Sequence, residues 1–223
     1  MRTITSAVQH RSMGKIAAVA GAALAFGLLL IAVRARWLPL ESIDQGVAAD
    51  LNRSVAANHP AAVRALTGIS LLGSHGVLGW LIGIAALVLL VRRRYRLAAY
   101  LLVAGAGALI LDPALKLAVG RLRPVVEHPV AVGGGNSFPS GHALASIIGY
   151  GALLLVFMPA LPRRIRPWII GAAALIVGAV GFSRLALGVH FVSDVLGAWC
   201  LGVAWLGLTA SLPALSDCSA SAR

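Results

Sequence analysis

Long apolar runs separated by short polar or basic segments follow one another along this chain of 223 residues. A helix that crosses a bilayer needs roughly 20 mostly apolar residues. The pattern therefore predicts an all-α fold, an integral membrane bundle of six transmembrane helices. The expected spans cover residues 16–33, 76–91 (with a start as early as Ile69), 97–117, 142–158, 168–182 and 191–212.

The two longest segments between these runs differ in character. Residues 34–75 mix apolar positions with charges such as Glu41 and Asp50, which is typical of one or two short amphipathic helices lying on the membrane surface. Residues 120–139 contain Pro124, Pro129 and the triplet Gly133–Gly135, so regular helix cannot persist through the whole segment. This segment is expected to be a loop.

Composition supports the membrane assignment. Apolar residues make up 59% of the chain, and charged residues make up 12%, about half the ~25% of an ordinary soluble domain. The net charge of +12 would suggest nucleic acid in a soluble protein, but most of this charge stands in short arginine clusters beside apolar runs. There such clusters set orientation and meet anionic headgroups. We therefore expect the lipid bilayer as a partner and no nucleic acid.

The positions of the basic residues predict an orientation. With the N-terminus in the cytoplasm, six spans place 11 of the 19 lysines and arginines on the cytoplasmic side, as the positive-inside rule requires. Arg34 and Arg36 weigh against this topology, because it puts them outside. The first apolar run is too long for a signal peptide, so we expect it to be an uncleaved span in the plasma or inner membrane. The expected organisation is a cytoplasmic tail, one six-span domain and a second cytoplasmic tail, over residues 1–15, 16–212 and 213–223.

Three polar segments lie at span ends that this topology sends to the outer face, where ionisable residues are candidates for function. The first holds Lys116 and Arg123, seven residues apart and thus about two helical turns apart, so that both can point to one place. A guanidinium fork and an ammonium both suit phosphate oxygens. Taken alone, this segment also fits ordinary positive charge that flanks a span.

The second segment, Pro139-Ser140-Gly141-His142, opens the fourth span. The first amides of a helix lack internal partners and carry partial positive charge, so they form a cradle for an anion. Ser140 adds a hydroxyl, and His142 stands where it can give a proton to a bound phosphate. The alternative is a helix cap with an interfacial histidine.

The third segment contains Arg184, His190 and Asp194. His190 and Asp194 are four residues apart, so on a helix they share one face and can touch. A carboxylate that accepts from one ring nitrogen fixes the tautomer and leaves the other nitrogen free to attack. A buried His–Asp pair with a purely structural role is the alternative.

Together the three segments resemble the signature of the type 2 phosphatidic acid phosphatase superfamily: K-x6-R-P, then P-S-G-H, then S-R-x5-H-x3-D. All the fixed positions of that signature are present in order. They are Lys116, Arg123, Pro124, Pro139, Ser140, Gly141, His142, Ser183, Arg184, His190 and Asp194. The motifs span about 80 residues, and residues upstream of them carry no motif.

The resemblance implies a role for each site residue. It makes His190 the nucleophile that forms a phosphohistidine, Asp194 the group that orients it, and His142 the general acid. The implied phosphate ligands are Lys116, Arg123, Ser140, Gly141 and Arg184. No metal and no cofactor are implied, because the sequence holds no carboxylate cluster for Mg²⁺. Of the neighbouring residues, we expect Asp112 to pair with Lys116, while Arg121 fits either phosphate contact or a headgroup contact.

The implied activity is that of a membrane phosphatase acting on a lipid-linked phosphate or diphosphate. Undecaprenyl diphosphate is the preferred substrate, with phosphatidic acid and phosphatidylglycerol phosphate as alternatives. A lipid phosphotransferase with the same intermediate and a non-catalytic membrane protein are the competing hypotheses. Residues 34–75 and the loop residues His128, Asn136 and Ser137 are candidates for shaping specificity or entry. The oligomeric state stays open.

Overall fold

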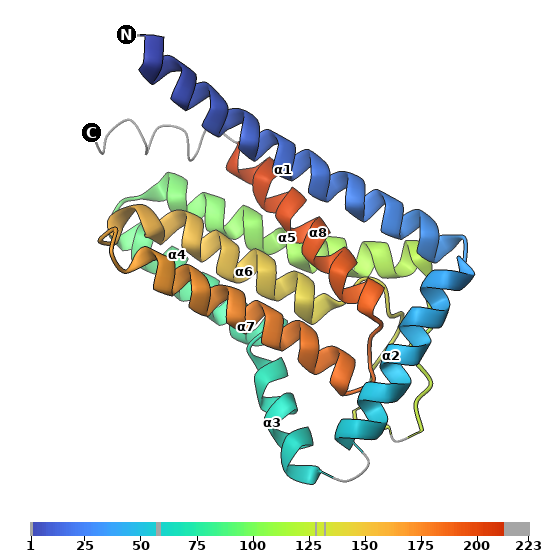
Figure 1. Ribbon diagram of the computed structural model, residues 1–223. Helices are drawn as coiled ribbons and strands as arrows, with labels where there is room; N and C mark the ends of the chain where they lie inside the picture. The colour runs from blue at the N-terminus through green and yellow to red at the C-terminus, as the bar shows by residue number, and fades with distance from the viewer. Residues whose placement is uncertain (1, 57–58, 128, 132, 212–223) are drawn as a thin grey trace.

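The computed structural model describes residues 2–56, 59–127, 129–131 and 133–211, and every regular element in them is helical (Figure 1). Seven α-helices among the described residues are 17 residues or longer. In chain order the elements are α1 (Arg2–Arg34), α2 (Leu38–Ala56), α3 (Pro60–Leu71), α4 (His75–Val91), α5 (Tyr95–Val119), α6 (Gly141–Phe157), the 3₁₀ turn η1 (Met158–Ala160), α7 (Arg166–Ala186) and α8 (Val192–Ala210).

Six segments are long and apolar enough to cross a membrane, which confirms the predicted fold class. Five of them agree with the expected spans to within a few residues. The second is longer than predicted, because α3 joins α4 in one candidate span, Pro60–Val91, that bends at Leu72–Ser74. Residues 34–75 form the short helices α2 and α3, as the expectation of one or two short helices in this segment had it. The C-terminal tail predicted at 213–223 lies outside the described residues.

The bundle is built by small residues on facing helices and by large apolar side chains on its outside. Its centre holds Tyr100 and Leu101 of α5 and Ile148 of α6, which are almost fully buried. Trp80 and Leu109 instead are more than half exposed, although both lie within candidate spans. Exposed apolar surface of this extent fits a protein whose solvent is the lipid interior.

The first helix packs against the last. A β-carbon at Gly207 of α8 would lie 2.1 Å from a methyl group of Val19, so only glycine allows α1 to approach α8 this closely. Nearer its end, α1 places Phe26 in a stack with Phe138 of the loop before α6, at 6.2 Å between ring centroids. α1 therefore supports both α8 and the segment that opens α6.

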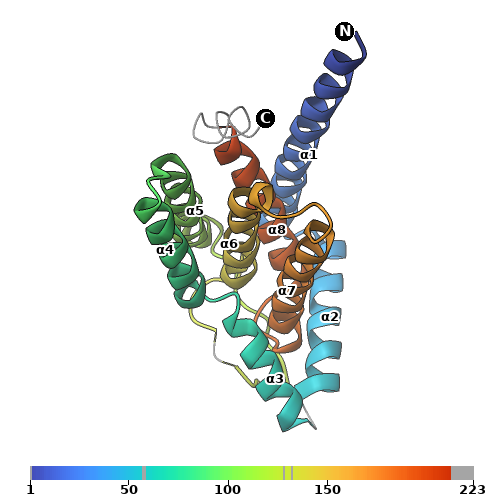
Figure 2. The same cartoon turned by 90° about the vertical axis from the view of Figure 1, so that its left-hand side faces the viewer.

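One end of the bundle gathers the connections that carry the polar motifs. The loop between α5 and α6, the turn between α7 and α8, and α2 all lie at this end (Figure 1). α2 and α3 diverge from the other helices and flank α7, against which both pack (Figure 2). The three motif segments predicted to share one face therefore meet at the same end of the fold.

Candidate active site

The His190–Asp194 pair forms where α7 gives way to α8. Gly188, at φ +68°, ends α7 in a left-handed conformation that glycine adopts freely. Asp194 lies in the first turn of α8, and its Oδ2 accepts from the Phe191 amide at 2.9 Å and faces His190 Nδ1 at 3.3 Å. His190 precedes the helix, so the expected contact across one helical face is wrong in its geometry. The pair meets because Asp194 caps the start of α8.

This pair is buried, and burial governs its charge state. Asp194 is fully enclosed and His190 is 2% exposed. Burial lowers the pKa of the His190 imidazole below its ordinary value, while the hydrogen bond and the negative charge of Asp194 oppose that shift. A neutral imidazole that donates from Nδ1 to the carboxylate keeps an unprotonated Nε2, as a nitrogen nucleophile must.

Arg123 stands directly in front of that nitrogen. Its Nη1 lies 3.2 Å from His190 Nε2 and donates to the Val189 carbonyl at 2.7 Å. Its other nitrogens donate to the carbonyls of Gly134 at 2.8 Å and Gly135 at 3.1 Å. Backbone groups therefore hold the guanidinium beside the candidate nucleophile without neutralising its charge.

Arg123 lies so close to the glycine-rich loop that a side chain at Gly133 would clash with it. A β-carbon at Gly133 would lie 2.7 Å from Cδ, Nε and Cζ of Arg123, whereas one at Gly134 would meet nothing within 4 Å. We expect Gly133→Val to displace the guanidinium and to lower kcat/KM by about 10- to 100-fold, and Gly134→Ala to leave it near wild type. Steady-state phosphate release by both purified variants checks this. Equal rates for the two would show that the position of Arg123 does not matter.

The start of α6 adds a hydroxyl, amides and a second histidine. The Ser140 amide donates to the Asp194 carbonyl at 3.1 Å, which fastens α6 to α8. The Ser140 hydroxyl is buried and has no hydrogen-bond partner in the described part of the chain, as a group that awaits a ligand would. A β-carbon at Gly141 would lie 2.8 Å from Asp112 Oδ2, so only glycine fits there. His142, one residue on, is half-buried.

Lys116 and Arg184 bring the remaining cations. Lys116 Nζ binds Asp112 Oδ2 at 2.8 Å, as predicted from their spacing. Arg184 Nη1 donates to the Ser70 hydroxyl of α3 at 2.5 Å, and its buried Nε lacks a partner among the described residues. His142 interacts electrostatically with Lys116, Arg184 and His190. Residues of all three motifs therefore lie close enough for their charges to act on one another.

Sequence reasoning missed the groups that support Asp194. Arg121 donates to Asp194 Oδ1 at 2.7 Å and to Asp44 Oδ2 at 2.8 Å, and it packs over the Phe191 ring. Asp44, on α2, also accepts from the amide of Ser193 at 3.0 Å and from its hydroxyl. The alternatives weighed for Arg121 were phosphate and headgroup contacts, yet its guanidinium bridges two buried carboxylates. Nothing in the sequence around Asp44 distinguishes it from the other acidic residues upstream of the motifs.

The loop residues expected to shape entry have structural contacts. Asn136 donates to the Lys116 carbonyl at 2.7 Å at the end of α5, and the Ser137 hydroxyl donates to the Leu122 carbonyl at 3.0 Å. Both therefore fold the loop back on the segment that follows α5. His128 lies outside the described residues.

This arrangement is suited to displacement at phosphorus. It offers a neutral imidazole aligned by a carboxylate, a second imidazole, three cations and an unused hydroxyl. Fixed cations and amides stabilise the oxygens of a transferring phosphoryl group without reorganising. Within the described ranges, no group of three His, Cys, Asp or Glu side chains is arranged to hold a metal ion.

Comparisons with known proteins agree with this chemistry. The family model described as the PAP2 superfamily matches residues 96–216. Phosphatidylglycerophosphatase B of Bacillus subtilis is 30% identical over 178 residues, which are 78% of this chain and 85% of that protein. Decaprenylphosphoryl-5-phosphoribose phosphatase of Mycobacterium tuberculosis is 33% identical over 67% of this chain and 80% of its own length.

Two further similarities complete the comparison. Undecaprenyl-diphosphatase of Sulfolobus acidocaldarius is 30% identical over 56% of this chain and 59% of that protein. The crystal structure of a transmembrane PAP2-type phosphatidylglycerolphosphate phosphatase from Bacillus subtilis superposes with a TM-score of 0.75 at 29% identity, covering 86% of this chain and 94% of that one. This chain therefore shares the half that carries the motifs with the family, and it shares most of its helical arrangement with the solved structure.

Proposed function

The chain belongs to the PAP2 superfamily and is a multi-pass membrane phosphatase of that type, and from this premise we propose that it hydrolyses a lipid-linked phosphate or diphosphate through a phosphohistidine. The observation that carries the proposal is the geometry around His190. Its Nδ1 faces Asp194 and its Nε2 faces Arg123, so the attacking nitrogen points at a cation that attracts phosphate.

The proposed reaction has two steps. His190 Nε2 attacks phosphorus, the bond from phosphorus to the leaving oxygen breaks, and His142 protonates that oxygen. Water then attacks the phosphohistidine, His142 takes a proton from it, and phosphate leaves with His190 restored. Asp194 keeps the imidazole oriented in both steps and stabilises its positive charge while it carries phosphorus.

The cations and the start of α6 are proposed to bind the phosphoryl oxygens. Lys116, Arg123 and Arg184 supply positive charge, and the Ser140 hydroxyl and the Gly141 amide supply hydrogen bonds. The unpartnered Ser140 hydroxyl and Arg184 Nε support this role, because both are buried without a partner among the described residues.

We further propose that the site faces the outer side of the membrane. The arginine clusters at 92–96 and 163–166 lie in the α4–α5 and α6–α7 connections, at the end of the bundle away from the candidate site (Figure 1), and such clusters favour the cytoplasm. The start of α1 lies at the same end of the bundle as these clusters (Figure 1), which supports a cytoplasmic N-terminus. The tail at 213–223 is expected to follow α8 to the same side.

Undecaprenyl diphosphate is the proposed substrate, with phosphatidylglycerol phosphate and phosphatidic acid as alternatives. The test measures phosphate release by the purified protein from each of these lipids, with and without a metal chelator. We expect release from at least one of them at a rate that the chelator leaves unchanged, because three side-chain cations supply the positive charge that Mg²⁺ would.

The same assay separates hydrolysis from phosphotransfer. Free phosphate in the amount of lipid consumed supports a hydrolase, while a new phosphorylated alcohol with little free phosphate would identify a transferase. Complete loss of activity with the chelator, restored by a divalent metal, would contradict the proposed metal-free mechanism.

A further inference from the structure

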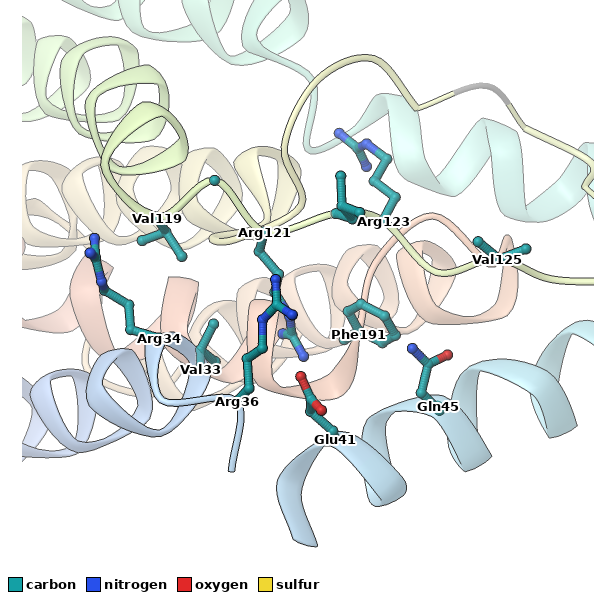
Figure 3. Close-up of a pocket in the computed structure, with 12 residues that line it drawn as sticks. Val33, Arg34, Arg36, Glu41, Gln45, Val119, Arg121, Arg123, Val125 and Phe191 are labelled. Carbon is teal, nitrogen blue, oxygen red and sulfur yellow. The ribbon is translucent and has the colours of Figure 1, made fainter. Parts of the chain in front are cut away.

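A polar cavity of about 430 Å³ lies beside the candidate site, between the end of α1, the start of α2 and the segment that follows α5. Figure 3 shows the side chains that line it. Arg36, Arg121 and Glu41 extend toward one another, whereas the side chain of Arg123 points away from them, to the far side of its segment. Arg123 therefore belongs to the wall of the cavity, while its guanidinium lies on the other side of that wall, beside His190.

The charges around this cavity are only partly neutralised by the protein. Arg121 is held by Asp44 and Asp194, and Arg34 donates one nitrogen to the carbonyl of Ala118. The guanidinium of Arg36 takes part in no hydrogen bond or ion pair within the described residues. Two guanidinium groups thus have donors to spare, against the single carboxylate of Glu41.

The backbone directs Arg36 to this place. Its φ of +49° lies in the left-handed region, which residues with a side chain adopt only at an energetic cost. This conformation turns the chain sharply between the last turn of α1 and the first turn of α2. The Arg36 side chain therefore starts at the turn between the two helices, beside the cavity.

The cavity lies at the end of a candidate span, which is where a lipid headgroup is expected. The candidate span of α1 ends at Arg34, immediately where the cavity begins. The next residues, Trp37 and Leu38, are 57% and 76% exposed, as interfacial anchors are. Arg34 and Arg36 lie on the outer side in the proposed topology, against the positive-inside rule. A headgroup site at this place would account for their positive charge.

The lining also indicates what kind of headgroup fits. Guanidinium forks bind phosphate oxygens, whereas Glu41 and Gln45, one turn apart on α2, accept hydrogen bonds from hydroxyl groups. The spare donors of Arg34 and Arg36 suit the oxygens of a phosphodiester. We propose that this cavity binds the headgroup of an anionic phospholipid that carries both a phosphodiester and free hydroxyls, separately from the lipid that reacts at His190.

The test titrates the purified full-length protein in neutral detergent with short-chain phosphatidylglycerol, phosphatidylcholine and inorganic phosphate. Binding is followed by tryptophan fluorescence, since Trp37 adjoins the cavity. We expect saturable binding of phosphatidylglycerol and none of phosphatidylcholine. Arg36→Gln and Arg34→Gln should each raise the Kd by about tenfold. Arg64→Gln, which removes the same charge from an exposed position of α3 outside the cavity, should leave it unchanged.

The outcomes separate the sources of the anion and the two proposals. Competition by inorganic phosphate that depends on Arg36 would support the site and identify phosphate alone as sufficient. Wild-type affinity for phosphatidylglycerol in both the Arg36 and the Arg34 variant would overturn it. Arg36→Gln is expected to release phosphate from the reacting lipid at the wild-type rate. A wild-type protein that releases no phosphate would contradict the proposed function and leave the binding result standing.

Discussion

Alanine in place of His190 is expected to lower kcat for phosphate release by about 10⁴-fold or more. The substitution removes the nitrogen that attacks phosphorus, and both oxygens of Asp194 are already engaged by Arg121 and the Phe191 amide. The wild-type protein quenched in alkali during turnover should carry phosphate bound to a histidine, and the variant should carry none. Rates and trapped phosphate are measured on the same preparations.

A matched histidine controls for nonspecific effects. His59 precedes α3, is exposed, and makes no side-chain capping hydrogen bond, so His59→Ala should keep the wild-type rate. Size-exclusion profiles and thermal midpoints show whether each variant is folded, because His190 is buried. A folded His190→Ala protein that still releases phosphate at the rate of His59→Ala would contradict the proposed mechanism.

The second large effect is expected at Asp44, far from the motifs in sequence. Asp44→Ala leaves the Arg121 guanidinium with one carboxylate instead of two and removes the acceptor of the Ser193 amide. Breaking a buried ion pair from one side costs about 3–5 kcal/mol. We expect that loss of unfolding free energy in detergent titrations, together with a fall in kcat, because Arg121 also steadies Asp194.

The chain offers a matched control on the same helix. Asp50 is 73% exposed and pairs with Arg53 at the surface, so Asp50→Ala should change stability by less than about 0.5 kcal/mol. Asp44→Asn, which keeps an oxygen acceptor, should recover part of the loss in both measurements. If Asp44→Ala were as stable and as active as Asp50→Ala, the network from α2 to Asp194 would have no role in holding the site.

Features that depend on nearby residues could be predicted from the sequence. The length of the apolar runs predicts six spans, and the structure contains six candidates. The spacing of Lys116 and Asp112 predicts their ion pair, because residues four apart on a helix are neighbours. Successive spans alternate in direction, and this alternation also predicts that the three motifs lie at one end of the bundle. In each case a short window or a simple alternation of direction contains the information.

Features that depend on packing between distant segments could not be read in this way. Asp44 and Ser193 are 149 positions apart, and they meet only because α2 packs against α7 and α8. The same folding makes Arg121, expected to contact phosphate or a headgroup, the bridge between two carboxylates. It also places the exposed Arg36 at the edge of a cavity. Likewise, His190 contacts Asp194 from a turn and not from a helix.

The sequence by itself therefore determined the class of fold, the spans and the set of residues proposed for chemistry. Only the tertiary structure decided which groups hold that set in place and where further charge remains unpaired. The physical reason is that hydropathy and helical spacing act over a few residues, whereas a buried ion pair or a cavity exists only once separate helices have packed.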